Sequence, residues 1–176
     1  MSQANIFLVG LMGSGKTTIG RQLARRMGRA FYDSDHEIVS RTGVRIPVIF
    51  ELEGEAGFRR REAQVIDELA AEGGVVIATG GGAVLNPDNR RRMRESGWVV
   101  YLDVPIAILL ERTRHDTNRP LLQVADPASR LNALRSERDA LYREIAHVVV
   151  DGSRVNSQIA VNKILVEWEK RCALST

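Results

Sequence analysis

The segment from residue 10 to residue 17 constrains this chain more than any other part of its sequence. It reads Gly-Leu-Met-Gly-Ser-Gly-Lys-Thr, directly after the apolar run Asn5–Val9. A helical pattern follows and ends at Gly28, with its apolar residues on one face: Ile19, Leu23, Ala24 and Met27. A strand that passes through such a glycine-rich turn into a helix is the setting in which this spacing binds phosphate groups.

The residue types in this loop match the chemistry of a bound triphosphate. Glycines let successive backbone N–H groups turn toward an anion, and the start of the helix adds the positive end of its dipole. Lys16 can reach the β- and γ-phosphate oxygens, and the Thr17 hydroxyl can bind Mg²⁺. We therefore expect the loop to bind a nucleoside triphosphate through these residues: Gly13, Ser14, Gly15, Lys16, Thr17 and Thr18.

Four further apolar runs predict strands, and the segments between them predict helices. The predicted strands are Ala30–Tyr32, Val75–Ala78, Trp98–Leu102 and His147–Val150. Helices are expected to begin near Asn86-Pro87, at Pro105 and at Asn156, the last with Ile159, Ile164, Leu165 and Trp168 inward. Since the strands are apolar throughout, the alternation predicts a parallel α/β sandwich with both faces of the sheet covered.

Length and composition set limits on the class of protein. A chain of 176 residues fits one domain, and the formal net charge of +3 gives no argument for a nucleic-acid partner or a membrane surface. No apolar stretch is long enough for a membrane helix, and the first strand begins too early to leave room for a signal peptide. We expect a cytoplasmic monomer that binds neither nucleic acid nor membrane.

The sequence Asp33-Ser34-Asp35 follows the second predicted strand. In extended chain, residues i and i+2 point the same way, so both carboxylates can face the crevice at the end of the strand. One can act on Mg²⁺ through its waters, and the other can accept hydrogen bonds from acceptor hydroxyls. The alternative is a polar turn in which Ser34 or Asp35 caps a helix that begins near His36.

Two later segments have both a functional and a structural interpretation. Arg59, Arg60 and Arg61 lie in a predicted helix that runs to about Glu72, so at most two of them can face a cleft, and all three can instead form surface salt bridges. The run 79–82, Thr-Gly-Gly-Gly, is either a tight turn or bare backbone that approaches a ligand.

The irregular stretch from about 115 to 127 predicts a lid, because long loops in compact domains are often functional. Arg119 lies within it, in the sequence Asn-Arg-Pro-Leu. An arginine there can neutralise charge on a transferring phosphoryl group when the site closes. It can equally be a loop arginine without that function.

These motifs, in this order, resemble the shikimate kinase family: residues 10–17, Asp33-Ser34-Asp35, Phe58-Arg59 with Glu62, the run 79–82, Arg119-Pro120-Leu121, and Tyr142-Arg143. The likeness spans nearly the whole chain. It implies a fold like that of nucleoside monophosphate kinases, a three-layer sandwich around a five-stranded parallel sheet. It also implies one domain over residues 1–176, with a substrate-binding helical segment at about 34–62 and a short lid at about 115–127.

The resemblance also implies an activity, the transfer of the γ-phosphoryl group of Mg·ATP to the 3-hydroxyl of shikimate. The positions that match shikimate contacts are Asp35, Arg59, Gly81, Gly82 and Arg143, with the two arginines on the ring carboxylate. Arg119 matches the lid arginine on the ATP phosphates, and Arg112 and Arg154 resemble the pair that flanks adenine. Thr17 would bind Mg²⁺ directly and Asp33 through water, with Lys16, Asp35 and Arg119 catalytic.

Three other classes compete with this interpretation. A gluconate or nucleoside monophosphate kinase would share the fold, although two forked arginines with one carboxylate suit a polyhydroxy acid better than a nucleotide. A GTPase would need an Asn-Lys-x-Asp element, and the nearest string, residues 162–165, lacks the aspartate. A catalytically silent ATP-binding module would have no need for Lys16, Thr17, Asp33, Asp35 and Arg119 together.

Overall fold

The computed structural model describes residues 4–153 and 156–174 and contains a five-stranded parallel sheet. The strands run in the order β2-β3-β1-β4-β5, with β1 hydrogen-bonded to both β3 and β4. Their bounds are Asn5–Val9 (β1), Phe31–Asp33 (β2), Val76–Ala78 (β3), Gly97–Asp103 (β4) and Val148–Asp151 (β5). The predicted strands are therefore confirmed, with shifts of one residue at most ends.

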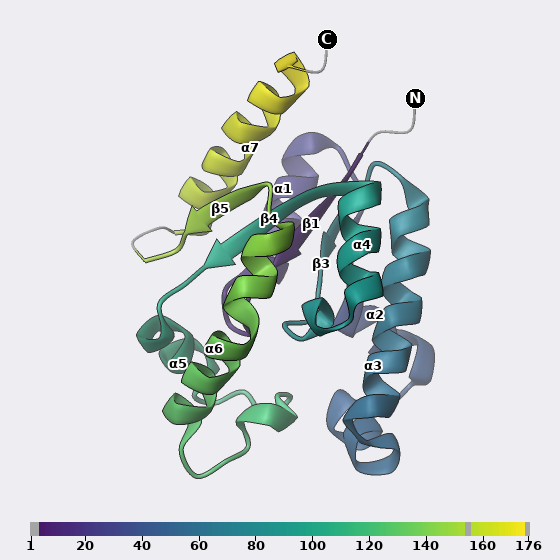
Figure 1. Ribbon diagram of the computed structural model, residues 1–176, viewed down its shortest axis with the longest axis vertical. Coiled ribbons are helices and arrows are strands. Elements are labelled where there is room, and N and C mark those ends of the chain that lie inside the picture. The colour runs from purple at the N-terminus through teal and green to yellow at the C-terminus, as the bar shows by residue number, and fades with distance from the viewer. Residues whose placement is uncertain (1–3, 154–155, 175–176) are drawn as a thin grey trace.

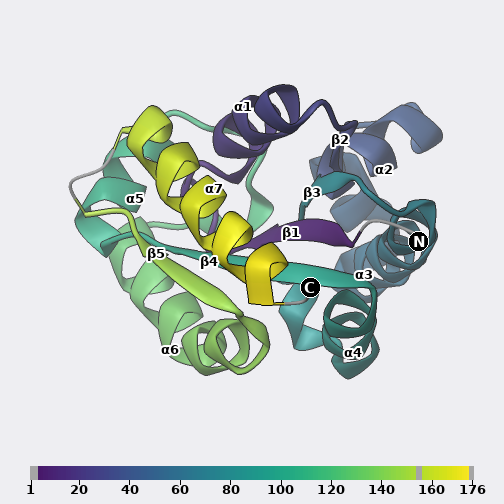
Figure 2. The same ribbon diagram turned by 90° about the horizontal axis from the view of Figure 1, so that it is seen from above.

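Helices cover both faces of the sheet, which confirms the predicted sandwich (Figure 2). One face carries α1 (Lys16–Met27) and α7 (Ser157–Leu174). The other carries α3 (Ile46–Glu72), α4 (Pro87–Ser96) and α6 (Pro127–Ile145). Alternate residues of β1 serve the two cores, because Phe7 packs with the second group of helices and Leu8 with the first.

The outer strands and α7 depart from the predicted burial. The sheet is buried at its centre, but β2 is half-buried and Val149 in β5 is 43% exposed, since an edge strand has a neighbour on one side only. In α7 the inward stripe is Ala160, Val161 and Ile164, with Leu165 and Trp168 partly buried beside it. Ile159 was wrongly expected to face inward: it is 45% exposed, because it lies to one side of that stripe.

The helix α2 (Ser34–Thr42) begins immediately at the end of β2. Its N-cap is Asp33, whose carboxylate accepts hydrogen bonds from the backbone N–H groups of Asp35 and His36. The structural alternative, in which Ser34 or Asp35 caps the helix, is therefore wrong. Because Asp33 holds the turn, the Asp35 side chain starts from the first turn of a helix with a fixed direction.

The carboxyl ends of the strands meet at one edge of the sheet, where the loops of functional interest lie (Figure 1). The segment 114–126 connects α5 (Ile106–Thr113) to α6 and contains only a short 3₁₀ turn, Pro120–Leu122. Open parallel sheets bind their ligands at this edge, beyond the carboxyl ends of the strands. Within the described ranges, no helix combines the length and hydropathy that a membrane crossing requires.

Candidate active site

The glycine-rich loop forms a tight cradle between β1 and α1. Gly15 is the N-cap of α1 and adopts the left-handed conformation, with φ of 94°, which an L side chain would disfavour. Lys16 is only 8% exposed, and its ammonium group donates to the carbonyls of Gly10 at 2.7 Å and Leu11 at 2.9 Å. The lysine is therefore held across the mouth of the loop. Burial, with a further effect of Arg119, lowers the pKa of Lys16 to about 8.

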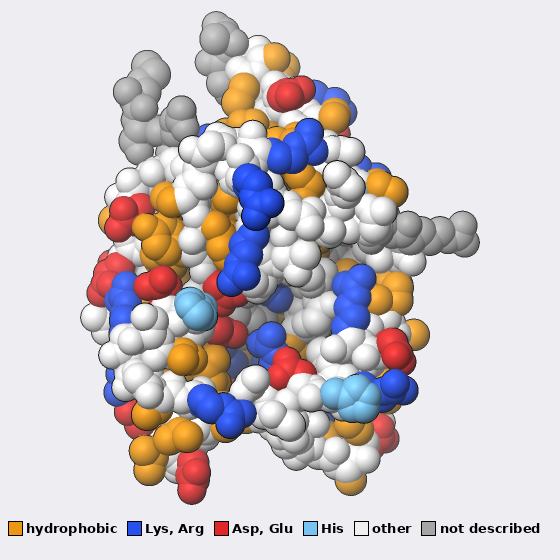
Figure 3. Space-filling model, turned by 180° about the vertical axis from the view of Figure 1, so that it is seen from behind, with side chains coloured by type: hydrophobic (Ala, Val, Ile, Leu, Met, Phe, Trp, Pro, Cys, Tyr) orange, Lys and Arg blue, Asp and Glu red, His pale blue; other side chains and the backbone are white. Residues whose placement is uncertain are grey.

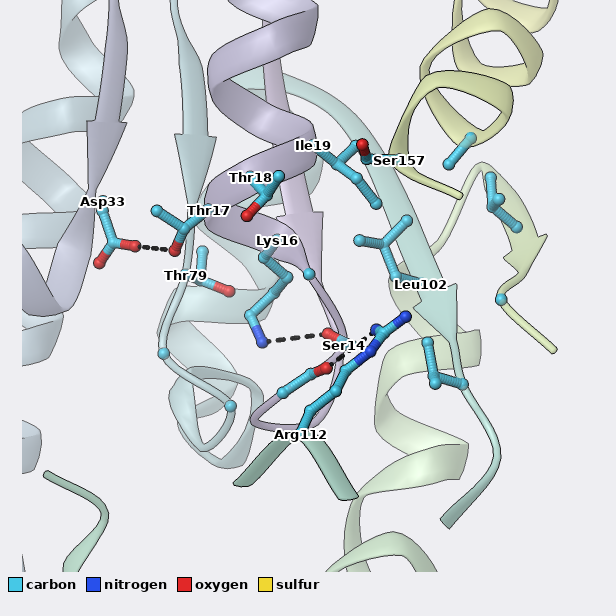
Figure 4. Close-up of a pocket in the computed structure, with 18 of the residues that line it drawn as sticks. Ser14, Lys16, Thr17, Thr18, Ile19, Asp33, Thr79, Leu102, Arg112 and Ser157 are labelled. Atoms are coloured by element: carbon cyan, nitrogen blue, oxygen red, sulfur yellow. Dashed lines mark hydrogen bonds between the residues drawn. The ribbon is translucent and has the colours of Figure 1, made fainter. Parts of the chain in front are cut away.

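A cavity of about 350 Å³ opens over this cradle, and we call it the phosphate pocket (Figure 4). Figure 3 shows a hollow on one face of the molecule that contains both positive and negative side chains. Its walls include all the described residues predicted to bind the nucleotide: Gly13, Ser14, Gly15, Lys16, Thr17, Thr18, Arg112 and Arg119. The guanidinium of Arg112 donates to the Gly13 carbonyl at 3.1 Å and so spans the pocket rim. Arg154, the predicted second adenine neighbour, lies outside the described residues.

Thr17 and Asp33 face each other at one wall of the phosphate pocket (Figure 4). The Thr17 hydroxyl donates to the Asp33 carboxylate over 2.5 Å, which joins the first turn of α1 to the end of β2. Hard oxygen donors of this kind suit Mg²⁺, which keeps several waters and takes few protein ligands in nucleotide sites. The donor atoms of the two side chains therefore fit the predicted metal.

A second, smaller pocket adjoins the first and contains buried charge, and we call it the arginine pocket. It is lined by Asp35, Arg59, Glu62, the glycines 80–82, Arg119 and Arg138, with apolar walls from Met12, Phe58 and Leu121. It contains four of the five predicted shikimate contacts: Asp35, Arg59, Gly81 and Gly82. A side chain at Gly82 would overlap the Arg59 guanidinium, so only a glycine allows this close approach.

The fifth predicted contact, Arg143, does not line either pocket. Its guanidinium binds Asp139 at 2.8 Å and Asp103 at 2.7 Å, stacks over Tyr101, and its side chain is 45% exposed. These partners lie on the outer side of α6 and at the end of β4. Because its guanidinium lies outside both pockets, the structure does not support Arg143 as a second carboxylate ligand beside Arg59.

Arg138, which the sequence analysis missed, lies where Arg143 was expected. It is 2% exposed, and its Nη1 faces Gly81 in the arginine pocket. Nε and Nη1 have no hydrogen-bond partner among the described residues, which is rare for a buried cation and leaves two donors for a ligand. The sequence feature that could have revealed Arg138 is its spacing. It lies on the same face of α6 as the apolar residues Leu131, Leu134, Tyr142 and Ile145.

The two pockets meet at residues that belong to both: Asp35, Gly80, Gly81 and Arg119. One Asp35 oxygen lies 3.4 Å from the Arg119 guanidinium, and the other is buried without a hydrogen-bond partner in the described structure. Burial and the neighbouring Asp33 raise the pKa of Asp35. Arg119 also binds Asp116 at 3.1 Å, so the lid turn directs it toward the junction.

Glu62 adds a second buried carboxylate to the arginine pocket. It is fully buried, and one of its oxygens accepts from Arg59 at 2.8 Å while the other has no partner among the described residues. Asp35 and Arg138 face it from α2 and α6. Burial outweighs the attraction of Arg59 and raises the pKa of Glu62 to about 7.

Replacing Glu62 by glutamine is expected to change how stability depends on pH. The pKa of Glu62 rises from 4.5 in the unfolded chain to about 7 in the fold, so ionisation costs stability progressively between those values. Above pH 7 that cost is on the order of 3 kcal/mol, which corresponds to roughly 5–10 °C in unfolding temperature. Relative to the E62Q variant, the unsubstituted protein should lose that amount between pH 5 and pH 8, measured by thermal unfolding.

Glu51→Gln is the matched control, since Glu51 is exposed in α3, before the kink at Gly54. Its unfolding temperature should follow that of the unsubstituted protein at both pH values. A constant difference between E62Q and the unsubstituted protein from pH 5 to pH 8 would contradict the assignment of Glu62 as a group that titrates in the arginine pocket.

The sheet order, the phosphate cradle and the adjoining arginine pocket together define a P-loop kinase that acts on a small molecule. The family model described as shikimate kinase matches residues 12–169. The chain therefore belongs to the shikimate kinase family.

Similar proteins agree with that family. A shikimate kinase of Dechloromonas aromatica is 63% identical over 166 residues, which cover 94% of this chain and 91% of that relative. One of Ralstonia nicotianae is 57% identical, with 96% and 89% covered. The solved structure of shikimate kinase from Acinetobacter baumannii in complex with shikimate has a TM-score of 0.94 and 48% identity, covering 96% of this chain and 94% of that one.

A gluconokinase from Sinorhizobium meliloti resembles the chain in fold alone. Its TM-score is 0.63 at 19% sequence identity. The fold alone therefore does not identify the acceptor.

Proposed function

We propose that this enzyme transfers the γ-phosphoryl group of Mg·ATP to the 3-hydroxyl of shikimate, with ATP in the phosphate pocket and shikimate in the arginine pocket. The observation that carries the proposal is the junction of the two pockets at Asp35, Gly80, Gly81 and Arg119. A group can pass there from one ligand to the other without leaving the site. The Acinetobacter relative, solved with shikimate, supports the choice of acceptor.

Two guanidinium groups hold the acceptor carboxylate in this proposal, and they are Arg59 and Arg138. Arg138 offers buried donors that have no hydrogen-bond partner among the described residues, although its Nε lies 3.9 Å from a Glu137 oxygen. Arg59 is held by Glu55 and Glu62 at 3.1 Å and 2.8 Å. Planar forks bind carboxylates through paired hydrogen bonds, which fix orientation as well as affinity. The ring of shikimate would then lie with its hydroxyls toward Asp35 and the glycine backbone.

The mechanism proposed is a direct in-line transfer that depends on position and charge neutralisation. Lys16 stabilises negative charge on the phosphate oxygens from the cradle, and Arg119 does so from the lid side of the junction. When bound, Mg²⁺ supplies further charge neutralisation on the phosphates, held by Thr17 directly and by Asp33 through water. Arg112 flanks the base, and Arg154 would be its partner.

Asp35 is the residue that can take the proton of the attacking hydroxyl. Its unpartnered oxygen is buried at the junction of the pockets, and its pKa is raised by burial and by Asp33. A raised pKa makes the carboxylate a better proton acceptor, provided that it is still ionised at working pH. Arg119 and Lys16 oppose that rise and keep the ionised form accessible.

The test is the release of ADP from Mg·ATP by the purified protein, measured with a coupled assay. Shikimate is compared with gluconate, with AMP and with no acceptor. We expect turnover with shikimate alone. Turnover with another acceptor would still support a P-loop kinase but would refute our assignment of Asp35, Arg59 and Arg138 to shikimate. Turnover without any acceptor would indicate an ATPase.

The remaining proposals concern the setting of the enzyme. We propose a monomer in the cytoplasm that forms one domain over residues 1–176, with its acceptor segment at about 34–62 and its lid at about 115–127. It would act on ATP and shikimate without a nucleic-acid or membrane partner. Size-exclusion chromatography with light scattering tests the monomer directly.

A further inference from the structure

Tyr142 is a fully buried tyrosine beside the arginine pocket, and the activity proposed above gives it no role. It lies on the inner face of α6, one helical turn after Arg138. Its hydroxyl donates a hydrogen bond to the backbone carbonyl of Gly81. Burial raises the pKa of Tyr142, so the hydroxyl keeps its proton and remains a donor.

The glycine turn that receives this hydrogen bond is held at several points, and its Gly80 N–H donates to the Ser34 hydroxyl at 2.9 Å. The carbonyls of Gly80 and Gly82 accept from Ala83 and Leu85, both at 3.1 Å, within the following 3₁₀ turn. The Gly81 carbonyl instead accepts from Tyr142. Glycine has no side chain to restrict its backbone, so the hydrogen bond from Tyr142 adds a constraint at the middle glycine of the turn.

The planarity of the peptide bond extends this effect to the arginine pocket. The Gly81 carbonyl and the Gly82 N–H belong to one trans peptide group and point in opposite directions. On the Gly82 side the backbone lies against the Arg59 guanidinium, where even a Cβ atom would not fit. A hydroxyl that holds the Gly81 carbonyl therefore also sets the direction of the Gly82 N–H, in the residue whose Cα lies against Arg59.

We propose that Tyr142 is a positioning residue for the acceptor: its hydroxyl orients the Gly81–Gly82 peptide so that the Gly82 N–H faces the arginine pocket. The inference rests on the proposed function, because it concerns the site assigned to shikimate. Two acceptor contacts, Arg138 and the Gly82 N–H, would then both depend on α6. Arg138 and Tyr142 lie on the same face of that helix, and each faces Gly81.

The ring of Tyr142 is itself held in place. It packs on the ring of Tyr101 with centroids 4.9 Å apart, and the Tyr101 hydroxyl donates to Asp139 at 2.7 Å. Asp103, at the end of β4, binds Arg135 at 2.6 Å and Arg143 at 2.7 Å and so ties α6 to the sheet. Removing only the Tyr142 hydroxyl leaves this packing in place.

The test is the Tyr142→Phe variant, measured by steady-state kinetics with each substrate varied in turn. We expect KM for shikimate to rise about tenfold, as for the loss of one hydrogen bond of ordinary net strength. KM for ATP should stay within about twofold, because the change acts on acceptor contacts only. Calorimetric titration with shikimate should show the same loss of affinity without turnover.

Tyr101→Phe is the matched control, since it removes a hydroxyl from the other ring of the same pair. Asp139 keeps its bond to Arg143, so KM for shikimate should not change. Equal rises in the two variants, or a rise in both KM values with a fall in unfolding temperature, would indicate a structural role and overturn the inference. So would an unchanged shikimate KM in Y142F. Absence of shikimate binding by the unsubstituted protein would instead overturn the proposed function.

Discussion

Replacing Lys16 by alanine is expected to lower kcat by about a thousandfold, the scale of losing one preorganised charge at a reacting group. Lys16 is the one lysine that lines the phosphate pocket in the described structure, and its ammonium group lies within the loop that cradles the phosphates. Water cannot replace it easily, because the site is buried. The measurement is ADP release at saturating ATP and shikimate.

Lys163→Ala is the control for this prediction, because Lys163 is exposed on α7 and lines neither pocket. It should keep kcat within about twofold, as for most surface substitutions. The fold of K16A should survive, since burial already disfavours the charged lysine and lowers its pKa. A K16A enzyme that keeps a tenth of the normal kcat would contradict the assignment of Lys16 as the main cation of the cradle.

The phosphate pocket could be predicted from sequence because its residues are neighbours in the chain. The loop geometry follows from a few glycines and a helix start, so each of Gly13 to Thr18 takes its expected place. The strands were predictable for a similar reason, since a parallel sheet covered on both faces has continuous apolar runs. Among the strands, the burial differed from the prediction only at the edges of the sheet, where β5, for example, has no strand on its outer side.

The arginine pocket was harder to predict, because it depends on which face each helix turns inward. Arg59, Arg60 and Arg61 are consecutive, and only Arg59 lines the pocket, while Arg61 binds Glu53 at 2.6 Å on the surface. Asp33 and Asp35 both line the phosphate pocket, but the extended geometry predicted for them was wrong, because Asp33 caps α2 and Asp35 lies in the first turn of that helix. When a helix begins in a loop of uncertain length, the sequence does not show which face of that helix turns inward.

The choice between Arg138 and Arg143 shows this limit most clearly. The two positions are five residues apart, which places them about 140° apart around a helix. The apolar stripe of α6 is hard to see in the sequence, because an arginine at an inward position interrupts it. Without the phase of that helix, the motif Tyr142-Arg143 points to the arginine next to Tyr142. The structure turns that residue outward to Asp103 and Asp139.

Replacing Arg138 by alanine is expected to raise KM for shikimate about a hundredfold, whereas Arg143→Ala should change it by about threefold or less. Arg138 is buried with donors that have no hydrogen-bond partner in the described structure, so its loss leaves an acceptor carboxylate without compensation. Arg143 forms partly exposed ion pairs, which contribute little individually. KM for ATP should change little in either variant. Steady-state kinetics and calorimetric titration with shikimate measure both effects.

The Arg138→Lys variant separates charge from geometry in the same experiment. Lysine keeps the positive charge but cannot form the paired, planar hydrogen bonds of a guanidinium. An intermediate KM would therefore show that part of the affinity comes from the fork itself. The reverse ranking, with Arg143→Ala more damaging than Arg138→Ala, would return the second carboxylate ligand to Arg143. It would also require its guanidinium to leave Asp103 and Asp139 when shikimate binds, since those two carboxylates occupy it in this structure.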